Sequence, residues 1–351
     1  MATWKFALTN LPTATTAQKT VAFLEKPQEM RYTRRRNGYC EMSLEVRDPG
    51  DLADLEGAVY RRAVAAWRNG VLRFNGQIVE HEETPEGFTI VAKDAYYNMS
   101  WRRVRTDITL GTGDAGGMAQ ALIDAQNFLQ NSFLVEGTIN PSVDGIGVKV
   151  KEGMVVAEQI DTFARFVGSF AFTIDAVMDV GTLGEFNAHF PINVVKEKAR
   201  FEFGSRTLEN VETYARKALP LVNKINVVGE MAGGATGVGQ ATSTTSPAIH
   251  GLWEDERGHV RVDTISRLEQ IAASQIMHYP KYAVSFRPTA EAPQLFTDFD
   301  VIHSVPTLIQ RRGKTYTGNK PVQRVTISLD PDSGAEVMEE LVLIDDDQET
   351  E

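Results

Sequence analysis

The stretch Arg31–Val46, RYTRRRNGYCEMSLEV, decides how the first part of the sequence is interpreted. Within it, Asn37-Gly38 separates two runs in which apolar and polar residues alternate. Asn-Gly between such runs is the strongest short-range signal for a β-hairpin, because the tight turn requires positive φ at both central residues. The same signal recurs at Asn69-Gly70, inside Ala63–Val79. We therefore expect two antiparallel hairpins here.

A third turn extends this pattern. Pro85-Glu86-Gly87 joins the alternating runs Gln77–Glu83 and Phe88–Ala92, and Pro with Gly is typical turn chemistry. The first hundred residues are thus predicted to form an antiparallel meander. They contain no recognisable catalytic motif, which favours a structural role for this part of the chain.

Composition narrows the classes of protein. At 351 residues, with 42% hydrophobic and 24% charged residues, the chain can form two or three globular domains. It has 36 Lys and Arg against 47 Asp and Glu, a net charge of -11, which argues against a protein that grips nucleic-acid phosphates. The single cysteine, Cys40, excludes an intramolecular disulfide and a cysteine-based zinc site, and its strand pattern predicts a core position.

The sequence contains no recognisable targeting segment. Residues 1–5, MATWK, lack the basic-then-apolar layout of a signal peptide. No apolar run approaches the roughly 20 residues of a membrane helix. We expect synthesis and folding in a host cytoplasm, without a membrane-spanning segment.

Three segments differ in character. Residues 1–105 are predicted to be mostly strand. Residues 106–200 should form an α+β unit: Asp114 is a candidate N-cap for a helix with an apolar stripe, and a second helix is predicted from Val155 to Val167. Residues 201–351 should be a second β-rich region. The expected fold class is mainly β with an α+β insertion.

The third segment has further expected features. Residues 233–246, rich in Gly, Ser and Thr, are predicted to be a flexible loop because this composition buries little. A helix is expected near 263–279, with an apolar face that includes Leu268 and Ile271. A closing hairpin should pair Val322–Leu329 with Glu336–Ile344, and the acidic residues 345–351 should be frayed.

Two glycine-rich motifs are candidates for phosphate binding. Gly111–Gly117, GTGDAGG, precedes a predicted helix, but its spacing differs from G-x-G-x-x-G and no P-loop lysine follows. Gly313-Lys314-Thr315 matches the end of a Walker loop, yet Leu308 stands where the first glycine would be. A capped helix entry and a chance match are the preferred interpretations.

No other motif indicates catalysis or metal binding. The histidines form no H-E-x-x-H or other close ligand pair, and there is no G-x-S-x-G nucleophile elbow. We expect no enzymatic activity and no catalytic, cofactor-binding or metal site. The scattered histidines are His81, His189, His250, His259, His278 and His303.

Two groups of side chains could contact partners. The cluster Arg34-Arg35-Arg36 flanks a hairpin turn; surface or intersubunit ion pairs are expected in preference to a nucleic-acid patch, which would need more such residues. Trp67, Trp101 and Trp253 are expected to be core or interface anchors in preference to sugar-stacking platforms.

The order of the pieces resembles the tail hub proteins, the minor tail proteins of long-tailed phages. In Ala66–Ile78 a strand ends in Arg-Asn-Gly and the next passes through Phe74-Asn-Gly-Gln-Ile, and Ala92-Lys93-Asp94 follows. These steps resemble the R-N-G, F-x-G-x-I and A-x-D patterns of that family's N-terminal barrel.

The rest of the chain resembles later parts of the family. The predicted helix Val155–Val167 running into Phe170–Ile174 resembles its inserted α+β unit. Phe201–Gly204 and Val222–Gly229 resemble the return into the barrel region, and Ile249–Glu254 with the closing hairpin resembles the last portion. Each pattern is degenerate, and their order along nearly the whole chain carries the resemblance.

The resemblance implies a structural subunit of a tail tip or baseplate hub. Such a hub is a homotrimer whose two barrels per chain surround a channel, so the resemblance implies two barrel-like regions, supplied by residues 1–105 and 201–351, and discontinuous domains. Expected partners are distal tail or tail tube proteins, the tape-measure protein, and receptor-binding or fibre proteins. DNA would pass without specific binding. The expected location is the virion tail tip, after assembly in the host cytoplasm.

Two alternatives remain open. One is a tail adsorption module that binds cell-surface carbohydrate through a β domain, which saturable binding to host envelopes would favour. The other, less favoured because no motif supports it, is a cell-wall hydrolase. Contractile and non-contractile tails are not distinguished by these patterns.

Overall fold

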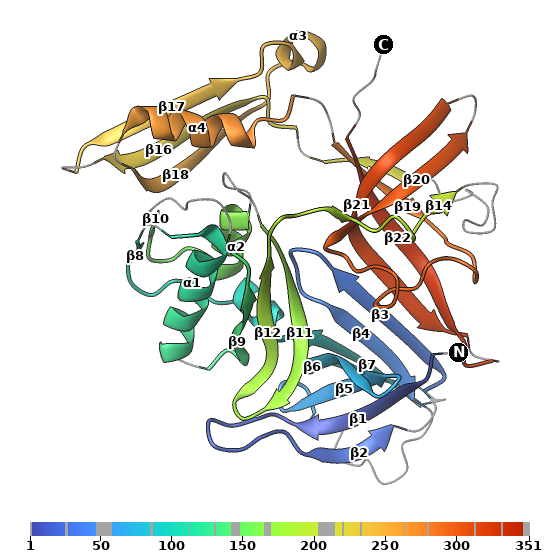
Figure 1. The fold of residues 1–351 in the computed structure, drawn as a ribbon. Helices are drawn as coiled ribbons and strands as arrows, with labels where there is room; N and C mark the ends of the chain where they lie inside the picture. Colours follow the sequence, from blue (N-terminus) through green and yellow to red (C-terminus); the bar gives the residue numbers. More distant parts are fainter. Residues whose placement is uncertain are drawn as a thin grey trace.

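Strands dominate the computed structural model of this chain, which has several sheets and few helices (Figure 1). This confirms the expected mainly β fold class with helical insertions. The structure describes residues 2–24, 27–46, 58–84, 87–111, 113–129, 131–141, 148–164, 170–202, 215–219, 221–231, 234–262, 264–278, 281–311, 314–330 and 333–346.

The largest sheet combines both ends of the chain. Among the described residues it has 14 strands, and its main path is β15-β19-β22-β21-β3-β4-β7-β6-β5-β1-β2. Its N-terminal strands are β1 (Trp4–Asn10), β2 (Thr20–Leu24), β3 (Glu29–Arg35), β4 (Glu41–Val46), β5 (Arg62–Arg68), β6 (Val71–Thr84) and β7 (Gly87–Asp94). Its later strands are β13 (Val194–Val195), β14 (Phe201–Glu202), β15 (Ala215–Ala218), β19 (Lys281–Phe286), β20 (His303–Arg311), β21 (Lys314–Leu329) and β22 (Glu336–Asp346).

Antiparallel pairing of β3 with β21 joins the two ends, with Thr33 opposite Thr326. One hydrophobic core underlies the junction and includes Tyr32, Phe74, Phe201 and Leu341. The first and last segments therefore share a sheet and a core, so neither buries its apolar surface alone. The predicted boundaries at 105/106 and 200/201 remain predictions.

The two Asn-Gly turns differ. Asn69 (φ 52°) and Gly70 (φ 80°) form the predicted two-residue turn between β5 and β6. The two-residue turn predicted at Asn37-Gly38 is wrong: β3 ends at Arg35 and β4 begins at Glu41, and only Asn37 has positive φ, 53°. This turn is wider because Asn37 N donates to Phe172 O (3.1 Å) and its Oδ1 accepts from Phe172 N (2.8 Å).

The α+β unit packs on a second core. Helix α1 (Ala115–Leu129) starts as predicted, since Asp114 Oδ1 accepts from Gly117 N at 2.9 Å. Helix α2 (Val156–Ala164) buries Ile160 and Phe163. Val155, the first residue of the predicted helix, instead forms an isolated β-bridge with Arg103, and residues 165–167 lie outside the described residues. The sheet beneath consists of β9 (Leu134–Ile139), β11 (Ala171–Asp179) and β12 (Thr182–His189), and the short helix η2 (Ala95–Ser100) follows β7.

A five-stranded sheet extends from this unit, and in Figure 1 it lies above α1 and α2 with α4 across it. Its strands are β8 (Ile108–Leu110), β10 (Val148–Val150), β16 (Lys224–Met231), β17 (Thr236–Thr242) and β18 (Glu254–Val262). Helix α3 (Ser246–His250) follows β17, and α4 (Ile265–Gln275) confirms the helix expected near 263–279.

The loop predicted at 233–246 is wrong for half of its residues, because β17 occupies Thr236–Thr242. Its glycines serve close packing: a Cβ on Gly239 would lie 2.3 Å from the Leu268 backbone carbon of α4. Glycine at this position lets α4 approach β17 closely. The glycine content that predicted a flexible loop is therefore explained by the packing of the helix on the strand. Among the described residues, no helix is long and apolar enough to cross a membrane.

Candidate functional site

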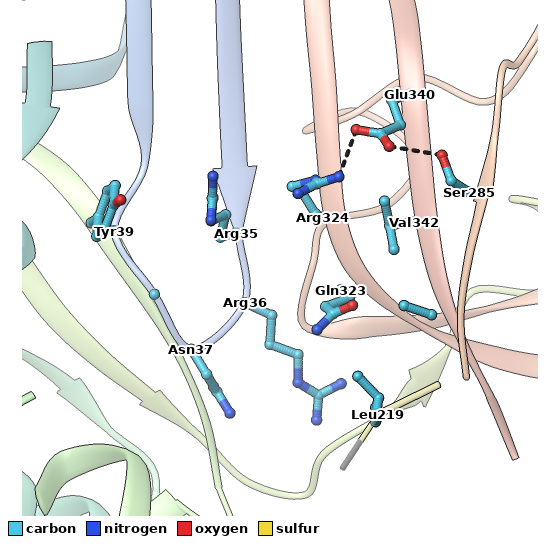
Figure 2. Close-up of a pocket in the computed structure, with 12 residues that line it drawn as sticks. Arg35, Arg36, Asn37, Tyr39, Leu219, Ser285, Gln323, Arg324, Glu340 and Val342 are labelled. Atoms are coloured by element: carbon cyan, nitrogen blue, oxygen red, sulfur yellow. Dashed lines mark hydrogen bonds and ion pairs between the residues drawn. The ribbon is translucent and has the colours of Figure 1, made fainter. Parts of the chain in front are cut away.

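A pocket of about 490 Å³ lies where the β3–β4 turn meets the last strands of the large sheet (Figure 2). The turn supplies one wall, and β19, β21 and β22 supply the other. The lining residues are Arg35, Arg36, Asn37, Gly38, Tyr39, Leu219, Ala283, Ser285, Gln323, Arg324, Glu340 and Val342. Three of these are arginines and one is a glutamate, so the lining carries a formal charge of 3 − 1 = +2 in a chain of net charge -11.

Arg36 lies at the turn with its guanidinium directed toward Leu219 (Figure 2). Its backbone N donates to Gln323 O at 2.9 Å, which holds the turn against β21. Its side-chain partner is neutral, since Nη1 donates to Asn193 Oδ1 at 2.5 Å. Burial lowers the pKa of Arg36 to about 10. Removal from water thus disfavours its charge, and among the described residues no carboxylate pairs with it.

Arg35 lies directly opposite Arg324 in the antiparallel pairing of β3 with β21. Like charges at such positions repel each other. The Nε atoms of both side chains are buried without a hydrogen-bond partner in the described part of the chain. The Arg35 guanidinium also lies 5.4 Å from the Tyr39 ring centroid. Cross-strand pairing therefore concentrates positive charge at this pocket.

Glu340 balances only one of these arginines. Its Oε2 accepts from Arg324 Nη2 at 2.8 Å, and its Oε1 accepts from Ser285 Oγ at 2.7 Å. Figure 2 shows this chain of contacts on the wall facing Arg35. Neither contact involves Arg35 or Arg36, and among the described residues no carboxylate pairs with these two arginines.

An aromatic series continues from the pocket. The Tyr39 and Tyr97 ring centroids are 5.2 Å apart, and the Lys93 ammonium lies 4.5 Å from the Tyr97 centroid. Tyr97 in turn meets Trp101 edge-on at 6.1 Å. Trp101 is 73% exposed. The surface beside the pocket thus combines cations and rings that can stack on a partner.

The third member of the arginine cluster has a different environment. Arg34 is 4% exposed, so the expected surface or intersubunit ion pair is wrong for this residue. Its Nε and Nη2 donate to Asp300 Oδ1 and Oδ2 at 2.7 and 2.9 Å, and Nη2 also donates to Asp175 Oδ1 at 3.0 Å. Burial alone would raise the pKa of Asp300, but the charge and hydrogen bonds of Arg34 lower it.

The A-x-D pattern ends in a buried structural carboxylate. Asp94 Oδ2 accepts from Cys40 N at 2.6 Å, and its Oδ1 accepts from Tyr96 N at 3.0 Å. It caps η2 and joins the beginning of β4 to the end of β7. Burial raises the pKa of Asp94 to about 7 despite these hydrogen bonds. Cys40 is buried beside it as predicted.

The phosphate-binding candidates lie far apart in the fold. At Gly111–Gly117 the Asp114 carboxylate occupies the position at the start of α1, which agrees with a capped helix entry. Lys314 and Thr315 begin β21, a strand, whereas a P-loop leads into a helix; Gly313 lies outside the described residues. Neither motif contributes to the pocket.

The other candidate side chains are also dispersed. Within the described ranges no three His, Cys, Asp or Glu residues are grouped as a metal site would require. His189 contacts Thr173 Oγ1 at 2.9 Å, and burial lowers its pKa. Trp67 is half-buried, whereas Trp101 and Trp253 are exposed. Sequence reasoning missed the pocket; the adjacent Arg35 and Arg36 were its only signal.

The comparisons with known proteins give a fold and no sequence family. No family model and no curated protein matches the sequence. Solved structures do match. The tail protein from Neisseria meningitidis MC58 has a TM-score of 0.59 and 11% identity, with 98% of this chain and 97% of that chain covered.

Two further phage-related structures match over similar lengths. The 43 kDa tail protein of prophage MuSo2 from Shewanella oneidensis has a TM-score of 0.57 and 11% identity, covering 97% of this chain and 98% of that one. The prophage tail protein gp18 from Listeria monocytogenes EGD-e has a TM-score of 0.55 and 12% identity, covering 97% and 95%. The chain therefore has the fold of these tail proteins along its whole length.

Proposed function

We propose that this chain is a structural subunit of a phage tail tip or baseplate hub. The observation that carries the proposal is the whole-chain fold similarity to the Neisseria tail protein, which covers 98% of this chain and 97% of that chain. A match of this extent includes the strand-rich ends, the α+β unit and the five-stranded sheet together. The order of the sequence patterns supports the same role independently.

The proposed assembly is a homotrimer whose ring closes or continues the tail tube. Residues 1–105 and 201–351 would supply its hub regions, with 106–200 between them. Pairing of β3 with β21 supports this division, since it unites the first and third segments in one sheet. The ring would contact distal tail or tube proteins, hold the tape-measure protein, anchor receptor-binding or fibre proteins, and let DNA pass without specific binding.

The test is the mass of the full chain in solution, measured by light scattering over a range of concentrations and followed by negative-stain imaging. The expected result is a trimer that forms rings with a central hole. A different closed oligomer without a hole would contradict the proposal. The role requires no catalysis, so clearing of a cell-wall zymogram would also contradict it.

One observation favours a second candidate, a carbohydrate-binding adsorption module. Trp101 is 73% exposed and meets Tyr97 at its edge, and exposed indole faces bind sugar rings well. Saturable binding of the full chain to host envelopes, lost in Trp101→Ala and retained in Trp253→Ala, would favour this candidate. Equal binding by both variants would contradict it.

A further inference from the structure

Several arginines in the described part of the chain pair with carboxylates, whereas Arg35 and Arg36 do not. Arg34, Arg68 and Arg324 each donate to a carboxylate of the same chain, at 2.7, 2.7 and 2.8 Å respectively. Arg35 and Arg36, which line the pocket, pair with no carboxylate in the described part of the chain. A charge that is partly removed from water and lacks a counter-charge is unfavourable. An anion that enters the pocket would supply the missing counter-charge.

The geometry of the pocket indicates carboxylates as that anion. Guanidinium groups bind carboxylates through two parallel N–H···O bonds, and Arg35 and Arg36 are adjacent on one wall (Figure 2). A pocket of about 490 Å³ accommodates a few side chains and excludes a nucleic-acid duplex. Apolar Leu219, Ala283 and Val342 lie beside the charges, and they can contact the side-chain carbon atoms of a peptide, which a free ion lacks.

The chain itself carries a segment of the complementary charge. Five of the seven residues 345–351, DDDQETE, are acidic. The chain reaches this segment along β22, which lines the pocket at Glu340 and Val342 and then continues past it to Asp346, opposite Lys281.

A second copy supplies this segment more easily than the same chain. Val342 and Asp346 are separated by four residue steps, about 13 Å along an extended strand. A return to the pocket of the same chain would require the chain to reverse its direction after Asp346. A neighbouring copy has no such constraint.

We propose that the pocket binds the acidic segment 345–351 of a second copy of the chain, with its carboxylates paired to Arg35 and Arg36. This contact rests on the proposed self-association and identifies the surfaces that meet. It is a heterologous contact, in which the segment of one copy enters the pocket of the next, and such contacts close into rings when the rotation permits. The assembly would thus neutralise the charge of Arg35 and Arg36, which no carboxylate among the described residues balances.

The test is binding of a fluorescent peptide of residues 344–351 to the full chain, followed by anisotropy. We expect saturable binding that weakens as salt is raised, because the contact is ionic. Arg35→Gln and Arg36→Gln should each weaken binding about tenfold or more, as expected for loss of one partner of a desolvated charge pair. Arg31→Gln is the matched control, since Arg31 lies on the same strand, is 57% exposed and pairs with Glu339.

A second peptide, with every Asp and Glu replaced by Asn and Gln, should not bind. Equal binding of this peptide, or equal affinity of the Arg36→Gln and Arg31→Gln proteins, would overturn the proposal. A short single-stranded oligonucleotide that binds with the same arginine dependence while the acidic peptide does not would also overturn it, in favour of a nucleic-acid site.

Failure of this proposal is distinguishable from failure of the proposed hub. The full chain with the five acidic residues of 345–351 neutralised should lose oligomerisation or form it at higher concentration. A trimer that forms unchanged would overturn the segment contact and leave the hub intact. If the chain binds the peptide but forms no ring, the segment contact would stand and the proposed hub would be overturned.

Discussion

Arg34 and Arg36 lie two residues apart at the end of one strand, yet their charges are compensated differently. Arg34 is 4% exposed and holds Asp300 through two hydrogen bonds, with Asp175 as a third contact. Arg36 is half-buried at a pocket and donates to the neutral amide of Asn193. The charge of Arg34 is therefore balanced by carboxylates of the same chain, whereas no carboxylate among the described residues balances the charge of Arg36. Two arginines of one cluster thus have different surroundings: Arg34 forms an internal ion pair, and Arg36 lines a pocket.

The two regions meet different segments for a geometric reason. The Arg34 site connects β3 to β11 through Asp175, and to the segment before β20 through Asp300. The pocket begins where β3 ends, because Asn37 pairs with Phe172 and turns the chain away from β21. The wide turn therefore separates a closed ion-pair site from an open arginine pocket.

The largest expected effect is at the closed site. Arg34→Gln should lower the free energy of unfolding by about 3 kcal/mol, because it leaves the Asp300 carboxylate largely buried without its counter-charge. Asp300 keeps 20% exposure, which places the loss at the lower end of the range for buried pairs. Urea denaturation measures it. The double variant Arg34→Met with Asp300→Leu should lose less than the single one; a larger loss would contradict the charge argument.

The next effect compares two acidic residues with opposite pKa shifts. The pKa of Asp94 is raised by burial to about 7, so the folded state keeps a proton that the unfolded chain has lost. Its contribution to stability falls as pH rises from about 4 to about 7. Asp300, with its lowered pKa, contributes stability that is lost as pH falls.

Denaturation of the natural chain and of Asp94→Asn, measured at several pH values, isolates the Asp94 contribution as a difference. The natural chain should lose stability relative to the variant as pH rises through this window. A difference that is independent of pH would contradict the buried position of this carboxyl.

Two glycines, Gly239 in a closely packed position and Gly113 in an open one, allow the same comparison for the effect of an added Cβ on stability. Gly239→Ala should destabilise the chain by about 1–3 kcal/mol, because its Cβ would overlap the Leu268 backbone of α4. Gly113→Ala is the control, since no atom lies within 4 Å of a Cβ placed there. Thermal unfolding followed by circular dichroism measures both. Equal shifts in Tm would show that α4 does not pack on β17 in this way.

The smallest effect is expected at the open pocket. Arg36→Gln should change the free energy of unfolding by no more than about 0.5 kcal/mol, because loss of the contact to Asn193 is offset by removal of an uncompensated charge. Urea denaturation alongside Arg34→Gln tests the comparison directly. A loss as large as that of Arg34→Gln would mean that Arg36 has an internal partner of equal weight.

The sequence correctly predicted those elements that are determined by residues close together in the chain. The turn at Asn69-Gly70 forms as predicted, because both φ angles are those that Asn and Gly tolerate. Helices α1 and α4 begin where an N-cap or an apolar period predicted them. At residues 233–246 the prediction failed, because low hydrophobicity indicates mobility only when nothing packs on the segment. Here α4 supplies the apolar partner, so a glycine strand is stable.

By itself, the sequence determined that this chain is mainly β, that its Asn69-Gly70 hairpin closes tightly, and that Cys40 is internal. These properties follow from backbone preferences and short-range periodicity. Only the tertiary structure decided that β3 pairs with β21, that Arg34 is buried between two carboxylates, and that Arg35 faces Arg324 across the strands. Such contacts join residues more than a hundred positions apart, and neither propensity nor spacing specifies which distant strand becomes the neighbour.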